Sequence, residues 1–190
     1  MTRHKLLAGA GLLALSSYAS ADGMNAGTVH FTGEIIEPSC IIQGNDGNDN
    51  NVPLGTYPTS LFEEVGSQSD DIPFTITLAE CPIQTTGLTS VQLTFEGATV
   101  PTSNADLLAV SAISTTGAQA ATNIGVAVST LARPDTLLKM DGSTEQIAIP
   151  LPTAVGDNVN AQFIARYQAT ALPVTAGPAD ANMTINILHK

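Results

Sequence analysis

The sequence is poor in positive charge. It has six lysines and arginines against 17 aspartates and glutamates, which gives a formal net charge of −11 at pH 7. Nucleic-acid binding requires basic clusters that neutralise phosphates, and an anionic membrane surface attracts the same kind of cluster. We therefore expect no nucleic-acid partner, and a soluble, self-repelling surface instead.

The residues that usually perform catalysis or bind metals are also scarce. The chain has three histidines, two cysteines and no tryptophan. His30 and His189 lie near opposite ends of the chain, so we expect no metal site from them within one subunit. No G-x-S-x-G or C-x-x-C motif occurs. We expect no catalytic residue, no metal and no cofactor.

No apolar run reaches the roughly 18 residues that a membrane-spanning helix needs. The first 21 residues contain a basic start, a short apolar core and the sequence Ala19-Ser20-Ala21. This order is typical of a secretory signal peptide with its cleavage site. We expect residues 1–21 to be removed on export, and the remainder not to be an integral membrane protein.

The two cysteines are Cys40 and Cys81. Because an isolated pair in an exported protein is usually oxidised, we expect a disulfide between them.

No sustained 3.6-residue apolar pattern is present, so long helices are not expected. Short β-rich runs recur instead between Gly, Pro, Asn, Asp and Ser clusters, which is typical of an all-β sandwich or barrel. Arg166 falls in one of these runs, where we expect an exposed surface charge. The expected strands are 29–36, 39–42, 52–55, 72–79, 90–96, 107–112, 124–130, 146–151, 161–170 and 181–188.

The segment 27–36 alternates with period 2, as a strand with one buried face does. Val29, Phe31 and Ile35 are the bulky residues of the apolar face, and Gly33 lies between two of them. A glycine at an inward position suits a place where another backbone approaches closely. The segment has no obvious partner strand nearby in the sequence.

The end of the chain alternates in the same way. Met183, Ile185, Ile187 and His189 share one face of an expected last strand. If this strand closes one side of a sheet, its outer edge is unpaired in a monomer. Such an apolar edge is an aggregation hazard unless another chain covers it.

The sequence resembles the chaperone–usher fimbrial subunits, the pilins of type 1-like fimbriae. The matching motifs follow in the family's order over nearly all of the chain after the signal peptide, and Gly177 opens the C-terminal segment. They are G-T-V-H-F-T-G-E-I-I at 27–36, V-P-L-G-T-Y at 52–57, F-T-I-T-L-A-E-C-P at 74–82, D-L-L-A-V at 106–110, I-G-V-A-V at 124–128 and F-I-A-R-Y-Q-A-T at 163–170.

The resemblance implies an incomplete immunoglobulin-like β-sandwich that lacks its last strand. A donor strand from a periplasmic chaperone, or from a neighbouring subunit at the outer-membrane usher, would complete it by strand addition. The implied organisation is a signal peptide at 1–21, a donor-strand extension at 22–37 and a pilin domain at 38–190. The implied route leads to the periplasm and then to the extracellular fimbrium.

The resemblance also assigns roles to residues. The disulfide maps to Cys40 and Cys81. The C-terminal carboxylate of Lys190 would bind basic chaperone side chains, and His189 replaces the tyrosine that is usual before it. The donor strand maps to Val29, Phe31, Gly33 and Ile35, and the acceptor edge and chaperone contact to Met183, Ile185, Ile187, His189 and Lys190.

The implied function is a structural subunit that polymerises by donor-strand exchange and supports cell adhesion. Two alternatives remain open at this point: a minor or adaptor subunit, and a single-domain adhesin that binds a host ligand directly. A direct-binding adhesin would need an exposed aromatic or polar pocket. A small secreted enzyme, the third class, has no chemical motif in its favour.

Overall fold

The computed structural model describes residues 28–33, 35, 40–44, 49–103, 105–115 and 117–189. The chain divides into two units, Met1–Ile36 and Glu37–Lys190, and all the strands belong to the second. No helix of the described ranges has the length and apolar character to cross a bilayer. The elements are β1 (Ile41–Gln43), η1 (Thr59–Leu61), β2 (Ile72–Ala79), β3 (Ser90–Glu96), β4 (Leu107–Ala109), β5 (Ile124–Thr130), β6 (Arg133–Leu137), β7 (Ile147–Pro150), β8 (Val159–Ala169) and β9 (Thr184–His189).

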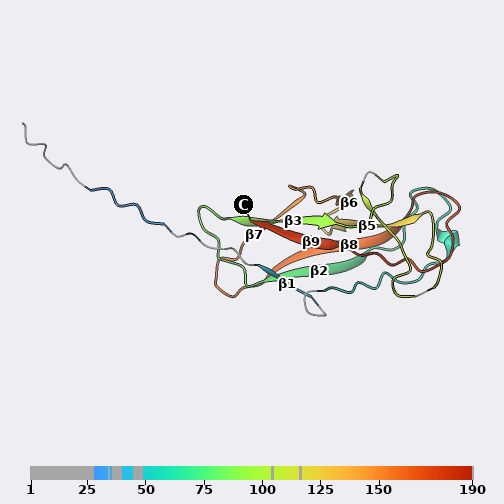
Figure 1. The fold of residues 1–190 in the computed structure, drawn as a ribbon, viewed down its shortest axis with the longest axis horizontal. Helices are drawn as coiled ribbons and strands as arrows, with labels where there is room; N and C mark the ends of the chain where they lie inside the picture. Colours follow the sequence, from blue (N-terminus) through green and yellow to red (C-terminus); the bar gives the residue numbers. More distant parts are fainter. Residues whose placement is uncertain are drawn as a thin grey trace, which may run out of the picture. The chain divides into compact units, whose positions relative to one another are not determined.

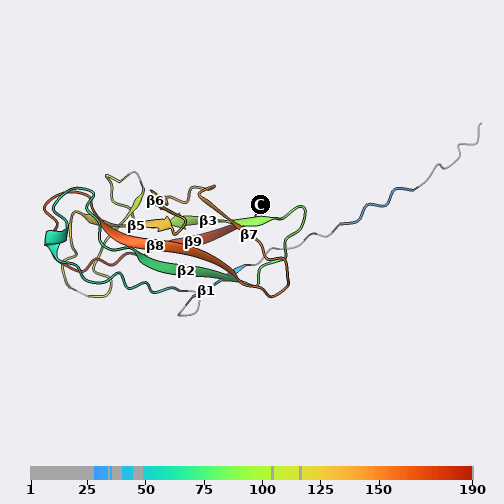
Figure 2. The ribbon, with the colours of Figure 1, turned by 180° about the vertical axis from the view of Figure 1, so that it is seen from behind.

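The strands form two antiparallel sheets. The larger sheet has the order β1-β2-β8-β5-β4, with β6 also paired to β5. The smaller sheet has the order β7-β3-β9. Figure 1 shows β3 and β9 in one layer and β2 and β8 in the other, and Figure 2 shows the same layers from behind.

Alternation in the sequence fixes which face of each strand is buried. In β2, Ile76 and Leu78 point into the core, and Thr77 on the other face donates to Asn160 Oδ1 at 2.8 Å. The register places Phe74 opposite Phe163 of β8. Strand β5 differs because every one of its residues is buried, as expected of a strand that has β8 on one side and β4 and β6 on the other.

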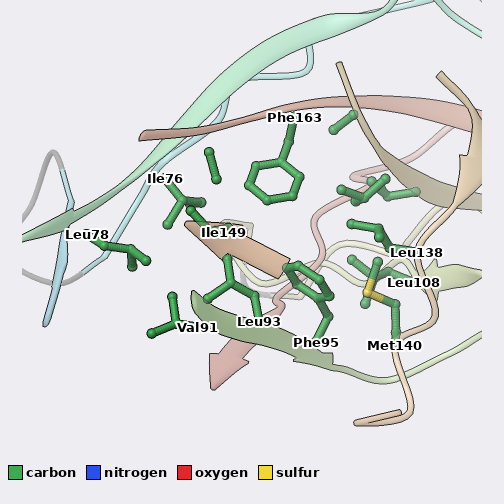
Figure 3. Close-up of a cluster of buried hydrophobic side chains, with 14 of the residues drawn as sticks. Ile76, Leu78, Val91, Leu93, Phe95, Leu108, Leu138, Met140, Ile149 and Phe163 are labelled. Carbon is green, nitrogen blue, oxygen red and sulfur yellow. The ribbon is translucent and has the colours of Figure 1, made fainter. Parts of the chain in front are cut away.

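The core lies between the two layers. Phe163 packs edge to face against Phe95, with ring centroids 5.8 Å apart, and stacks on Phe74 at 5.4 Å. Figure 3 shows Phe163 and Ile76 facing the side chains that come from β3. Burial of each large apolar side chain contributes about 1.5–3 kcal/mol, so this cluster is the main source of stability.

The structure overturns two of the expected strands and adds one that the sequence did not predict. Residues 52–55 form no strand, and residues 28–33 and 35 form none either, with Glu34 and Ile36 outside the described residues. A strand requires a hydrogen-bonding partner, and neither segment enters a strand pair among the described residues. Conversely, the sequence pattern missed β6, whose Arg-Pro-Asp start is unusual for a strand.

The expectation of an exposed Arg166 is wrong. Its position in β8 is on the outer face of the larger sheet, but the residue is only 4% exposed. Its Nη2 donates to the carbonyl of Pro134 at 3.0 Å, and its Nη1 donates to Ser129 Oγ at 3.2 Å. The segment that contains β6 therefore covers the arginine. Nη1 also lies 3.4 Å from Asp71 Oδ1, which forms an ion pair.

Candidate functional site

The last strand carries an apolar row that is only half buried. Met183, immediately before β9, and Ile185 and Ile187 within it pack against the main core but stay partly accessible, while the alternate residues Thr184, Asn186 and Leu188 are exposed. This is the alternation expected from the sequence. The core-facing side chains of this row are therefore only partly covered by the rest of the domain.

Strand β9 is also paired on one side only. Among the described strands its partner is β3, with Ile185 opposite Phe95 and Ile187 opposite Leu93. The backbone groups on its other side face no strand in the described part of the chain. An edge with free N–H and C=O groups and half-buried apolar side chains is suited to the addition of one more strand.

The larger sheet has a similar open stretch. Residues 77–79 of β2 pair with β1, whereas Ile72 to Ile76 pair only with β8 in the described part of the chain. Phe74 is half buried there, as are Ile42 and Leu54 nearby in the same core cluster. Both sheets thus contribute incompletely covered side chains to one core.

The described apolar residues of the segment expected to donate a strand are exposed. Val29, Phe31 and Ile35 are 74%, 93% and 100% exposed. A Cβ placed on Gly33 would meet no atom within 4 Å. An alternating row of large apolar side chains that stays in water is costly, and such rows usually mark a binding surface.

Of the last two residues of the expected site, the structure describes only the backbone of His189. The backbone of His189 pairs with that of Val91 at the end of β9. The side chain of His189, and Lys190 as a whole, lie outside the described residues. Their expected contact with a chaperone stays a prediction.

The disulfide is formed between Cys40 and Cys81, as predicted from the sequence, with the two Cα atoms 4.2 Å apart. Cys40 immediately precedes β1, and Cys81 follows β2 after one further residue. The bond therefore ties the start of the domain to the paired ends of these strands.

Two residues that sequence reasoning missed hold the chain before β9. The carboxylate of Asp180 accepts hydrogen bonds from Ser114 Oγ at 2.6 Å and from Ser114 N at 2.8 Å. These bonds lower the pKa of Asp180 below its usual value. Tyr167 donates from its hydroxyl to the carbonyl of Ala179 at 3.0 Å, and burial raises its pKa. Nothing in the local sequence pattern pairs residues so far apart.

Two open hollows lie elsewhere on the domain. One, of about 350 Å³, is lined mainly by small residues from the segments 100–110 and 121–124. The other, of about 470 Å³, lies between β7 and the start of β8 and includes Arg133. Neither contains the apolar row of β9.

Within the described ranges, no group of three or more His, Cys, Asp or Glu residues could hold a metal ion.

The fold and its half-covered last strand define a class, the incomplete immunoglobulin-like β-sandwich. This chain is similar to the crystal structure of the P pilus rod subunit PapA, with a TM-score of 0.55 at 20% identity. The match covers 78% of this chain and 98% of the PapA chain. At this identity the likeness establishes the fold alone.

Sequence comparison identifies the family. The model of the family described as "Fimbrial protein" matches residues 29–189. A type-1 fimbrial protein subunit of Serratia marcescens is 37% identical over 188 residues, which cover 98% of this chain and 99% of the relative. The uncharacterised fimbrial-like protein SfmA of Escherichia coli K12 is 36% identical over 94% of this chain and 92% of its own length. The chain belongs to the fimbrial protein family and is a structural subunit of a pilus.

Proposed function

We propose that this pilus subunit polymerises by donor-strand exchange, with β9 as the acceptor edge and residues 29–35 as the donor. The observation that carries the proposal is the half-buried apolar row of β9 on an edge that no described strand pairs. The exposed row of Val29, Phe31 and Ile35 supplies side chains of the matching kind. An added strand would bond the free backbone and cover the core at the same time.

The same proposal assigns the partners and the route. A periplasmic chaperone would lend a strand to β9 during export, an outer-membrane usher would exchange it for the extension of a neighbouring subunit, and the product would be an extracellular fimbria that supports adhesion. Residues 1–21 would be the signal peptide, 22–37 the extension and 38–190 the pilin domain. The carboxylate of Lys190 and the ring of His189 would bind the chaperone.

The test uses a subunit that lacks residues 22–37 and a peptide that copies residues 25–36. The peptide should raise the melting temperature of the subunit, because it binds the folded state only. The matched control is the same peptide with Val29, Phe31 and Ile35 changed to serine, which keeps the backbone donors but not the apolar row. An unchanged melting temperature in a large excess of the parent peptide would refute strand donation.

A further inference from the structure

The hollow beside β7 differs in charge from the rest of this acidic chain. Arg133 is the one charged residue among those that line it, and Nη2 of its guanidinium donates to the carbonyl of Gln146 at 3.4 Å. Leu131 and Ile147 supply apolar walls, and the amides of Asn160 and Gln162 supply polar ones. A guanidinium in a hollow without lining carboxylates favours a ligand that carries a carboxylate.

The hollow also borders an unpaired sheet edge. Among the described strands, β7 pairs with β3 alone, so the backbone on its other side faces the hollow rather than a strand. Leu131 is 46% exposed at this place. The surface thus combines apolar contact area, backbone polar groups and one cation.

A turn with complementary chemistry lies on the loop before β2. Glu64 and Ser67 close a tight turn in which Ser67 N donates to the carbonyl of Glu64 at 3.1 Å and Glu64 N donates to Ser67 Oγ at 3.2 Å. Gly66, with φ of +92°, donates from its N–H to the carbonyl of Ala169 at 2.9 Å. The turn is therefore fixed to the end of β8.

The tip of this turn is acidic and apolar. Val65 is 65% exposed, and both Glu63 and Glu64 before it are exposed. A rigid turn that holds an apolar side chain beside carboxylates loses little conformational entropy on binding. Its chemistry matches a hollow with aliphatic walls and one guanidinium.

One subunit cannot bring these two surfaces together. The turn is anchored at Ala169, whereas the hollow contains Asn160 and Gln162 of the same strand. The seven residue-to-residue steps from Gln162 to Ala169 span about 23 Å at roughly 3.3 Å per step. The contact must join two copies, and a contact between two different surfaces of identical copies repeats along a filament.

We propose that the Glu63–Val65 turn of one copy docks in the Arg133 hollow of another copy in the assembled pilus. The contact rests on the proposed polymerisation, which brings copies close together, but it is separate from strand exchange. Val65 would contact Leu131 and Ile147, and the carboxylates of Glu63 and Glu64 would pair with Arg133.

Cysteine cross-linking tests the contact in assembled fibres. The two native cysteines are already bonded to each other, so any cross-link between subunits must come from the introduced cysteines. A subunit with Val65→Cys and Ala148→Cys should give a ladder of covalent multimers on oxidation, because Ala148 lines the hollow. The control subunit carries Ile113→Cys in place of Val65→Cys; Ile113 is also an exposed aliphatic, at 54%. Equal ladders, or no ladder from the Val65 pair, would overturn the proposal.

A charge exchange tests its chemistry. Arg133→Glu should strongly reduce the cross-linking yield, and adding Glu63→Arg and Glu64→Arg to the same chain should restore it. Lys139→Glu is the matched control, since Lys139 is exposed but does not line the hollow. An unchanged yield with Arg133→Glu, or no restoration by the exchange, would count against the contact.

Electron microscopy of the same samples separates the two proposals. Fibres that form without the cross-link refute the docking contact and leave strand exchange intact. Absence of fibres from the parent subunit refutes both.

Discussion

Arg166 holds the segment that contains β6 against the outer face of the larger sheet. Its guanidinium is buried and bonds both Ser129 and Pro134, so it connects β8, β5 and β6. Its ion pair with Asp71 is of a different kind, because the Asp71 side chain is 50% exposed and water screens the interaction. The arginine therefore acts mainly through its bonds to the buried Ser129 hydroxyl and to the Pro134 carbonyl.

We therefore expect substitutions of Arg166 and of Asp71 to lower the free energy of unfolding by different amounts. Arg166→Ala should lower the free energy of unfolding by about 2–4 kcal/mol, since the Ser129 hydroxyl and the Pro134 carbonyl each lose a partner. Asp71→Asn, the control, should cost less than about 1 kcal/mol. Urea denaturation of the strand-complemented subunit measures both, and hydrogen exchange of the β6 amides should accelerate only in Arg166→Ala. Equal costs would contradict this account.

Gly125 is a second residue whose identity the packing determines. A Cβ at this position in β5 would lie 2.9 Å from the carbonyl oxygen of Leu108 and 3.1 Å from Leu107 Cβ. Gly125→Ala should therefore push β4 away and cost about 1–3 kcal/mol, as overpacking usually does. Gly87→Ala is the matched control, because nothing lies within 4 Å of its Cβ position. Thermal denaturation compares the two, and equal melting temperatures would contradict the packing argument.

At the scale of elements, the sequence predicted the strands that have a clear period. The observed bounds of β2, β3 and β5 equal those expected from alternation and from flanking turn residues. The expected strand 52–55, and the described residues of the expected strand 29–36, form no strand because pattern alone does not supply a pairing partner. Strand β6 was missed since Pro134 and the charges beside it oppose strand propensity, and only its pairing with β5 creates it.

The same reasoning explains which features of the candidate site could be predicted from the sequence. The apolar rows of 29–35 and 183–187 follow from period-2 alternation, and the structure shows the second on an edge strand. The burial of Arg166 could not be predicted, because alternation gives the face of the sheet but not what covers that face. The Asp180–Ser114 bonds depend on a contact between residues 66 apart.

The disulfide should stabilise the first two strands. It closes a loop with a sequence separation of 41, for which the chain-entropy relation gives about 4 kcal/mol. The double variant Cys40→Ala with Cys81→Ala should lose a comparable amount of unfolding free energy in urea. Free-thiol titration of the denatured, unreduced parent is the control and should find no thiol; two thiols per chain would contradict the assignment.

Gly33 tests the register of the proposed donor strand. If it faces a shallow part of the acceptor site, Gly33→Leu should cost about 1–3 kcal/mol of strand binding through overpacking. Subunits bound to the proposed chaperone should still fold, whereas fibre growth after mixing should slow severely. Thr32→Leu, on the opposite face, is the control and should polymerise like the parent. Parent-like growth of Gly33→Leu would mean that the register proposed here is wrong.

At the scale of the whole molecule, the excess of negative charge opposes the folded state. Without residues 1–21, which contain Arg3 and Lys5 and no acidic residue, the formal charge is −13, and a compact fold concentrates this repulsion. We expect the melting temperature of the complemented subunit to rise with added NaCl, up to and beyond about 0.15 M, where the screening length is about 8 Å. The rise should shrink near pH 4, where carboxylates become protonated. A melting temperature that falls with salt at pH 7 would contradict this expectation.

The position of the disulfide also decides how the domain bears tension. A pull on the chain before Cys40 passes through the sulfur–sulfur bond directly to Cys81. The residues enclosed by that bond, with β1, η1 and β2 among them, cannot be drawn out while the bond is intact. About 40 residues, or roughly 140 Å of extended chain, are thereby withheld from stretching. A pilus built from such subunits would lengthen only through the contacts between them and through strands after Cys81.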